Sequence, residues 1–289
     1  MSTIALVLVL SAAVAHAGWN LLAKTATGGA VFVWLVAATS AVLLTPVAAV
    51  ALAQGAGADL GLEGVAFMAG SGALHAGYFV LLQRGYRVGD LSLVYPLARG
   101  IGPLLATLTA IVLLEERPSG LALAGGAAIV VAVLSLAGGP RRLRASGPEA
   151  AEAVGYALAT GVFIAGYTLW DKHAVGPLGL SPILYFWGTV VANAALLTPV
   201  IVHRSGELRE TWRANRRAAL GVGILSPLAY VLVLYALATA PVSYVAPARE
   251  VSILIGAALG TQLLAEGDVG RRLACASAIV LGIAALAIG

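Results

Sequence analysis

Residues 91–114 have the sequence LSLVYPLARGIGPLLATLTAIVLL, with Arg99 as their one charged side chain. A helix needs about 20 consecutive apolar residues to cross a bilayer, and this stretch is long enough. The run Ile111–Leu114 is apolar on every side, whereas a strand of a membrane barrel alternates apolar and polar residues. The stretch therefore predicts a membrane-spanning helix.

The rest of the chain has the same character. Of its 289 residues, 60% are hydrophobic and 10% are charged, with a mean hydropathy of +0.96. Soluble domains have about a quarter of their residues charged, so this composition excludes an ordinary soluble enzyme. The single cysteine, Cys275, excludes an internal disulfide. Windows of about 19 residues predict ten helical spans, at residues 3–22, 30–53, 62–83, 91–114, 119–138, 152–170, 180–203, 217–238, 243–264 and 271–288.

Basic residues gather in alternate connections between the predicted spans. Connections after odd-numbered spans contain 13 of the 17 Lys and Arg, namely Lys24, Arg84, Arg87, Arg141, Arg142, Arg144, Arg204, Arg209, Arg213, Arg216, Arg217, Arg271 and Arg272. The positive-inside rule then puts these connections in the cytoplasm and both termini outside. It also explains the net charge of +4 without a nucleic-acid partner. Ala15-His16-Ala17 resembles a signal cleavage site, but no Lys or Arg precedes the apolar stretch, so we expect no cleavage.

The two halves of the chain repeat one another at an offset of 148 to 151 residues. The matched pairs are Ala17–Lys24 with Ala165–Lys172, Ser92–Pro96 with Ser243–Pro247, and Leu113–Glu116 with Leu263–Glu266. We therefore predict a first repeat at residues 1–138, a linker at 139–149 and a second repeat at 150–289. Five spans in each repeat force an inverted orientation, which is a transporter design with a site near the midplane. A duplicated structural membrane protein is the alternative.

Several motifs of the chain resemble a known family. They are Ala236–Pro247 (ALATAPVSYVAP), a proline in the fourth helix of each repeat, and the acidic residues Glu116 and Glu266. Over essentially the whole chain this set resembles the EamA branch of the drug/metabolite transporter superfamily. The resemblance implies ten helices and export or exchange of small metabolites, amino acids among them, often driven by a proton gradient. His16–Asn20 with Tyr95–Arg99 further resembles a subgroup linked to phosphonate utilisation.

Arg99 is the first candidate for a substrate-binding residue. It lies about 12 Å along the fourth span, and an ionisable group at such depth is costly enough to suggest a function. Tyr95 and Gly102 share its helix face. This face would bind an anionic group such as a carboxylate or phosphonate. The alternative is that Arg99 snorkels or pairs with a structural carboxylate.

Glu250 occupies the repeat position equivalent to Arg99. We expect Glu250 on the outer side of the cavity and Arg99 on its cytoplasmic side. The neighbouring Arg249 is also a candidate substrate-binding residue, and it points about 100° away on the helix. Glu250 is the candidate for proton coupling or for binding a substrate ammonium, or else it is a static partner of Arg249 or Arg99. Pro96 and Pro247 free backbone carbonyls that either line the cavity or merely mark kinks.

Aromatic and polar side chains at helical spacing form further candidate cavity faces. The candidate binding residues among them are His16, Trp19, Asn20, His75, Tyr78, Tyr167, Trp170, Tyr230 and Tyr244. Such faces also occur as polar contacts between helices or as anchors at the membrane interface.

The sequence thus predicts an all-α integral membrane protein and a multi-pass secondary transporter of the plasma or inner membrane. Its leading function is export of small metabolites such as amino acids, by alternating access. The alternatives are transport of organic anions such as phosphonates, or a membrane scaffold or sensor. No cofactor, metal site or catalytic residue is predicted, because the four histidines lack metal-ligand spacing and no phosphate-binding loop is present. The expected partners are a small-molecule substrate, membrane lipid and protons, for a monomer or a homodimer. Gly256 and Gly260 fit a close-packing pattern that acts either within the bundle or between subunits.

Overall fold

The computed structural model describes the chain except residues 25, 58–59, 89–90, 137–147, 254 and 256–268, and a few helical residues, Lys24 and Tyr95 among them, are described by backbone alone. The described part is helical and contains no strand. Its helices are α1 Thr3–Lys24, α2 Gly29–Ala53, α3 Leu62–Val88, α4 Leu91–Leu113, α5 Gly120–Leu136, α7 Pro148–Val175, α8 Pro182–His203, α9 Ser205–Thr239, α10 Val242–Ala248 and α12 Val269–Ile288. This confirms the predicted all-α membrane fold.

Length and composition make these helices suitable for a bilayer. Six of them, α1, α2, α3, α7, α8 and α9, are long and apolar enough to cross it, and shorter apolar helices lie within α4, α5 and α12. Large apolar side chains such as Leu62, Val112 and Ile288 are mostly exposed on the outer surface. A continuous exposed apolar surface would be unfavourable in water and is expected where lipid surrounds the bundle.

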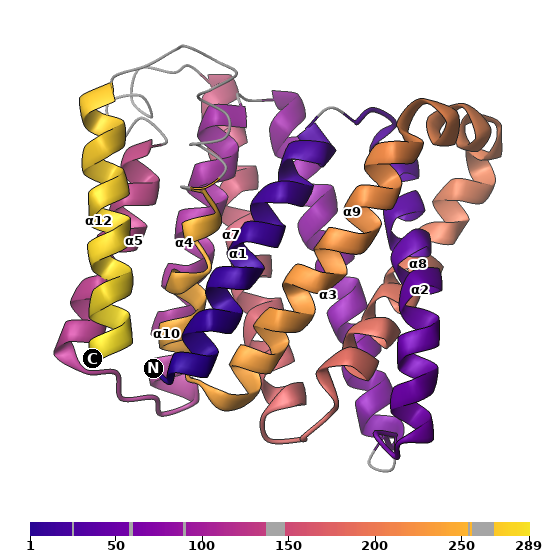
Figure 1. Ribbon diagram of the computed structural model, residues 1–289. Helices are drawn as coiled ribbons and strands as arrows, with labels where there is room; N and C mark the ends of the chain where they lie inside the picture. Colours follow the sequence, from indigo (N-terminus) through magenta and orange to yellow (C-terminus); the bar gives the residue numbers. More distant parts are fainter. Residues whose placement is uncertain (25, 58–59, 89–90, 137–147, 254, 256–268) are drawn as a thin grey trace.

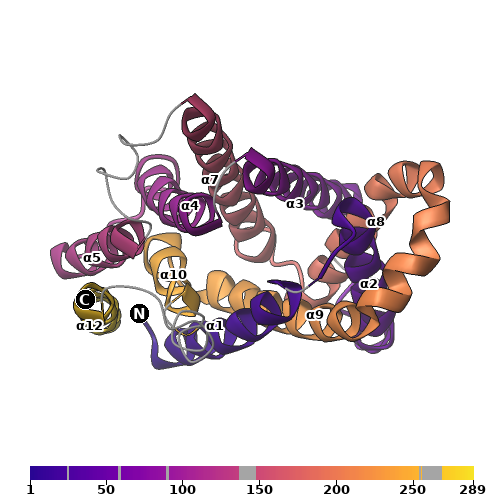
Figure 2. The same ribbon diagram turned by 90° about the horizontal axis from the view of Figure 1, so that it is seen from above.

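The helices form one bundle, and both termini lie at the same end of it (Figure 1). Figure 2 shows α1 and α9 along one side, α3 and α7 along the other, and the pair α5 and α12 standing at the edge. The packing is paired: α1 packs on α9 as α7 packs on α3, and α2 packs on α9 as α8 packs on α3. This exchange of partners is what two inverted repeats would produce.

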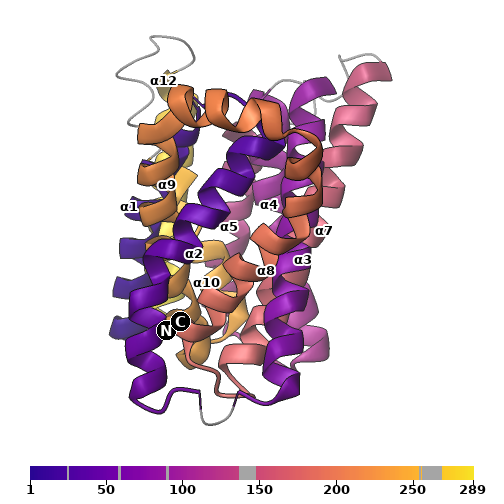
Figure 3. The same cartoon turned by 90° about the vertical axis from the view of Figure 1, so that its right-hand side faces the viewer.

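The end opposite the termini contains the basic positions. Arg84 and Arg87 lie near the C-terminal end of α3, and Arg271 lies in the first turn of α12. The first part of α9, which contains Arg209 and Arg213, lies across this end before the helix enters the bundle (Figures 1 and 3). We call it the basic end, and the other the terminus end. Which end faces the cytoplasm stays a prediction.

Two predicted span boundaries were wrong in ways that affect the site. The sixth span was expected to end at residue 170, but α7 continues to Val175 and so includes Asp171 and Lys172. The ninth span was expected to be one helix from 243 to 264, but α10 ends at Ala248, and a turn follows. Hydrogen bonds of i to i+3 type form this turn, from Glu250 N to Pro247 O (3.0 Å) and from Ile253 N to Glu250 O (2.9 Å). Proline lacks the N–H that a regular helix needs, which favours such a break.

Candidate substrate-binding site

A cavity lies in the middle of the bundle. Its volume is about 990 Å³ when the solvent at its open mouth is included. On α1 it is lined from His16 to Ala23, and on α2 from Phe32 to Ser40. These are the C-terminal half of α1 and the N-terminal half of α2, so the cavity extends from the midplane toward the basic end. Its other lining residues are His75, Tyr78, Phe79, Arg99, Tyr167, Phe186, Thr189, Val190, Asn193, Val222, Ser226, Tyr230 and Arg249.

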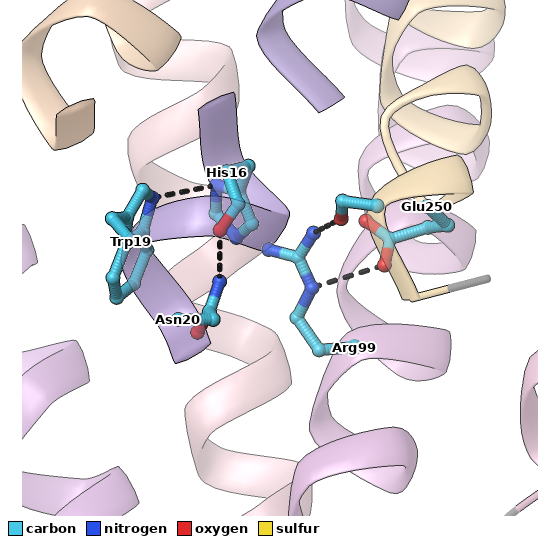
Figure 4. Close-up of polar contacts among 6 residues, drawn as sticks. His16, Trp19, Asn20, Arg99 and Glu250 are labelled. Atoms are coloured by element: carbon cyan, nitrogen blue, oxygen red, sulfur yellow. Dashed lines mark hydrogen bonds and ion pairs between the residues drawn. The ribbon is translucent and has the colours of Figure 1, made fainter. Parts of the chain in front are cut away.

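Arg99 and Glu250 form a buried ion pair beside the cavity. Arg99 donates from Nε to Glu250 Oε2 at 3.0 Å and from Nη2 to Ser252 Oγ at 3.4 Å, and both charged side chains are less than 5% exposed. Figure 4 shows the guanidinium between His16 of α1 and Glu250. The expectation that Arg99 and Glu250 lie on opposite sides of the cavity is therefore wrong. The turn after α10 brings Glu250 back toward α4.

Arg249, next in the chain to Glu250, has different surroundings. It is 7% exposed and lines the cavity, and its Cζ lies 5.5 Å from the centre of the Tyr230 ring. The ion pairs among the described residues do not include it. A guanidinium over an aromatic face retains its charge and its N–H donors, since the ring acts only through its quadrupole. Arg249 can therefore bind an anionic group in the cavity.

Aromatic rings form the wall across from α1. His75 stacks on Tyr167, with ring centres 4.2 Å apart, and meets Tyr230 edge-on at 5.2 Å. Phe186 lies 5.1 Å from Tyr230, and Tyr78 lies edge-on to Tyr167 at 5.9 Å. These residues come from α3, α7, α8 and α9, so the cluster joins four helices around one face of the cavity. Such a wall favours an apolar or aromatic solute.

The polar face predicted on α1 contributes two side chains to the opposite wall. Trp19 donates from Nε1 to His16 Nδ1 at 3.3 Å, and both residues line the cavity. Asn20 donates from Nδ2 to the His16 carbonyl at 2.7 Å and is not among the lining residues in the described structure (Figure 4). Its amide therefore satisfies the backbone of its own helix.

Residues 152–288 match the EamA-like transporter family. The second half of the chain is therefore similar to a family of membrane transporters. A solved structure described only as "Crystal structure of protein" has the same fold, with a TM-score of 0.76 and 17% identity, covering 98% of this chain and 97% of that chain. No curated protein sequence matches the chain.

Three further predicted binding residues lie elsewhere or are described by backbone alone. Trp170 is 37% exposed, stacks on Phe67 and donates to the Phe67 carbonyl at 2.9 Å, so it packs on the outside of the bundle. Tyr244 accepts a hydrogen bond from Ser119 N and donates to Gly289 O, at the terminus end. The side chain of Tyr95 is outside the description.

Of the two acidic residues predicted at the ends of the fourth spans, Glu116 and Glu266, only Glu116 lies in the described part of the chain. The Glu116 carboxylate accepts hydrogen bonds from Val242 N at 2.7 Å and Ser243 N at 2.9 Å, at the start of α10. A carboxylate at a helix start stabilises the free N–H groups there. Glu266 and the glycines Gly256 and Gly260 lie outside the described residues.

Sequence analysis missed two charged residues on α7, Asp171 and Lys172. Asp171 is fully buried on α7 and accepts hydrogen bonds from the hydroxyls of Tyr185, at 2.7 Å, and Tyr230. The rule that flags intramembrane charges would have found it. The span was ended one residue too early, which assigned Asp171 to a connection. Lys172 was missed for the same reason; its Nζ donates to the carbonyls of Leu237 (2.6 Å) and Ala240 (3.1 Å).

The described residues contain no group of three or more His, Cys, Asp and Glu side chains that could bind a metal. The described histidines instead make ring contacts and single hydrogen bonds, as His16 and His75 do with Trp19 and Ser71.

Proposed function

We propose that the protein is a secondary transporter that moves a small organic anion with an apolar or aromatic body through the central cavity. The observation that carries this proposal is Arg249, a buried guanidinium on the cavity wall whose partner is an aromatic ring. An anionic group bound there would form charge-assisted hydrogen bonds, which are about twice as strong as neutral ones. The rings around His75 and Tyr167 would contact the body of the solute.

The charges around the cavity favour an anion over a zwitterion. Arg99 and Arg249 are lining residues, whereas neither Glu250 nor Asp171 is. Both carboxylates already accept hydrogen bonds, from Arg99 and from two tyrosines. An amino acid would have to place its ammonium against aromatic faces alone, a cation–π contact worth about 0.5–2 kcal/mol. Amino-acid export is the second candidate, supported by these aromatic faces.

We further propose that transport proceeds by alternating access and outward across the plasma or inner membrane. The exchanged packing partners of α1 and α7 support two inverted repeats, at residues 1–138 and 150–289, that rock against one another. The cavity extends toward the basic end, which the positive-inside rule assigns to the cytoplasm. A solute entering there would be released at the terminus end.

The test compares three probes that share one body. 3-Phenylpropanoate has a carboxylate, L-phenylalanine adds an ammonium, and phenethylamine has the ammonium alone. Uptake of each labelled compound into proteoliposomes is measured at pH 8, with and without an imposed pH gradient, and phenylphosphonate tests the phosphonate alternative. We expect saturable uptake of the carboxylate and a loss of about tenfold or more in uptake for Arg249→Gln, because one charge-assisted contact is removed.

Arg249→Lys is the matched variant, since it keeps the charge but loses the planar fork of donors. We expect intermediate uptake for this variant. Saturable uptake of L-phenylalanine alone would replace the anion proposal by amino-acid transport. Uptake of phenethylamine that persists in Arg249→Gln would show that the cavity selects cations and would contradict both.

A further inference from the structure

Asp171 makes two contacts of the same kind, and only one of them reaches the cavity. The hydroxyls of Tyr185 on α8 and Tyr230 on α9 both donate to its carboxylate. Tyr230 is a lining residue of the cavity, but Tyr185 is fully buried and is not. A carboxylate in a membrane interior is costly unless it is well hydrogen-bonded, so Asp171 strongly favours the conformation in which both hydroxyls point toward it.

Tyr230 also lies at a boundary between two cavities. A smaller cavity, of about 250 Å³, shares four lining residues with the main one: His16, Arg99, Tyr230 and Arg249. Its remaining lining residues are Ala12, Ala13, Ala229 and Val233. Ala12, Ala13 and Val233 lie on the terminus side of His16 and Tyr230, because α1 starts at the terminus end and α9 ends there, whereas Ala229 directly precedes Tyr230.

The four shared residues therefore form a thin layer, which we call the gate layer, across the middle of the protein. On one side is the cavity that extends to the basic end. On the other is the small cavity, whose remaining lining residues are three alanines and one valine. Beyond it Lys172 and Glu116 connect helices through hydrogen bonds to backbone groups. A solute that crosses the protein has to displace the gate layer first.

We propose that Asp171 is a positioning residue that keeps the Tyr230 ring in the gate layer and so separates the two cavities. Asp171 acts through the Tyr230 hydroxyl, and the ring in turn lies against Arg249. Release of this hydrogen bond lets the ring swing aside and joins the cavities. The inference rests on the proposed transport function, because a gate matters only where a solute passes.

The arrangement is specific to one repeat. In the alignment of Ala17–Lys24 with Ala165–Lys172, the residue equivalent to Asp171 is Ala23, which has no carboxylate. The lysine that follows is present in both repeats, as Lys24 and Lys172. The contact between Asp171 and the Tyr230 hydroxyl therefore has no counterpart at Ala23 of the first repeat.

The experiment measures access to the small cavity with a cysteine reporter. Ala13→Cys is introduced with Cys275→Ala, so that position 13 carries the only thiol, and the purified protein is treated with the anionic methanethiosulfonate ethylsulfonate. Ser226→Cys, which lines the main cavity alone, serves as the reference reporter. We expect Asp171→Asn and Tyr230→Phe each to raise the labelling rate at position 13 by about tenfold, with little change at position 226.

Tyr185→Phe is the matched control, because it removes the other hydroxyl from the same carboxylate without touching the cavity. We expect less than a twofold change in labelling for this variant, and Asp171→Glu should stay close to the parent protein. An equal rise in Tyr185→Phe and Tyr230→Phe would overturn the proposal, since it would indicate general loosening of α7, α8 and α9. An unchanged rate in Tyr230→Phe would overturn it as well.

Tyr230→Phe keeps the test decisive even where Asp171→Asn fails to fold, because it removes one oxygen atom and no charge. The labelling rate needs no substrate, so an incorrect substrate class leaves its outcome valid. Binding of 3-phenylpropanoate to Tyr230→Phe is measured beside the labelling rate. Loss of binding with unchanged labelling would instead make Tyr230 a substrate contact and would contradict its role as a gate.

Discussion

The two ends of the bundle are stabilised by different kinds of contact. At the terminus end, Lys172 donates to two carbonyls of the α9–α10 region and Glu116 accepts from two N–H groups of α10. At the basic end, the described contacts include neutral pairs: Asn215 of α9 with Thr27, which precedes α2, and Trp34 of α2 with Thr198 of α8. Hydrogen bonds that involve a charge are stronger than neutral ones, particularly away from water.

This difference explains why the cavity extends toward one end only. The charged contacts join α7 to the end of α9, and the connection after α4 to α10, so they close the terminus end. Under the alternating access proposed above, these contacts would break when the basic end closes. The terminus end is therefore where substitutions should change the balance between conformations, and the midplane is where they should change stability.

The largest effect is expected at the midplane, between the two ends. Glu250→Ala leaves Arg99 buried without its carboxylate, and removal of one partner of a buried ion pair costs about 3–5 kcal/mol. We expect a large fall in the free energy of unfolding, measured by denaturant titration in detergent. Replacing both residues, as Arg99→Leu with Glu250→Leu, should recover most of the loss. A double variant as unstable as Glu250→Ala would mean that the pair does not act as a unit.

A smaller effect, on conformation, is expected at the terminus end. Lys172→Met keeps the length of the side chain but removes its hydrogen bonds to Leu237 and Ala240, so the terminus end should open in a larger fraction of molecules. Spin labels at the exposed positions Pro177 and Pro241 would report this as a new population at longer distance, increased about tenfold over the parent protein. Lys172→Arg should restore the parent distribution. A distribution unchanged by Lys172→Met would show that the lysine does not stabilise the closed end.

Hydropathy was sufficient to predict the fold, because the length of an apolar run and the thickness of the bilayer determine where a helix crosses. It could not predict the break after α10. The residues there, Val245 to Ile253, are as apolar as a regular span except for Arg249 and Glu250. Glu250 pairs with Arg99 of α4, whereas Arg249 lies against the Tyr230 ring of α9. These two different environments exist only once α4 and α9 pack against the turn.

Sequence analysis predicted only some of the residues that line the cavity: it included Tyr167 correctly and Trp170 wrongly. Tyr167 and Trp170 are three residues apart and share a helix face, so sequence analysis grouped them. They also differ by about 4.5 Å along the helix axis, and this displacement carries Trp170 past the cavity to Phe67. Periodicity gives the direction of a side chain, whereas the extent of a cavity along the axis depends on the neighbouring helices.

The smallest effect is expected at Tyr244, which sequence analysis proposed as a binding residue and which the structure places in a contact at the terminus end. Tyr244→Phe removes a hydroxyl that makes hydrogen bonds of 3.4 Å with Ser119 N and 3.2 Å with Gly289 O. Bonds of this kind contribute about 0.5–1.5 kcal/mol each, so thermal unfolding should shift by a few degrees at most. Transport should keep its half-saturating concentration, because the hydroxyl lies away from the cavity. A weakened half-saturating concentration with unchanged stability would return Tyr244 to the substrate pathway, and the charged contacts around it would then belong to the pathway rather than to closure of the terminus end.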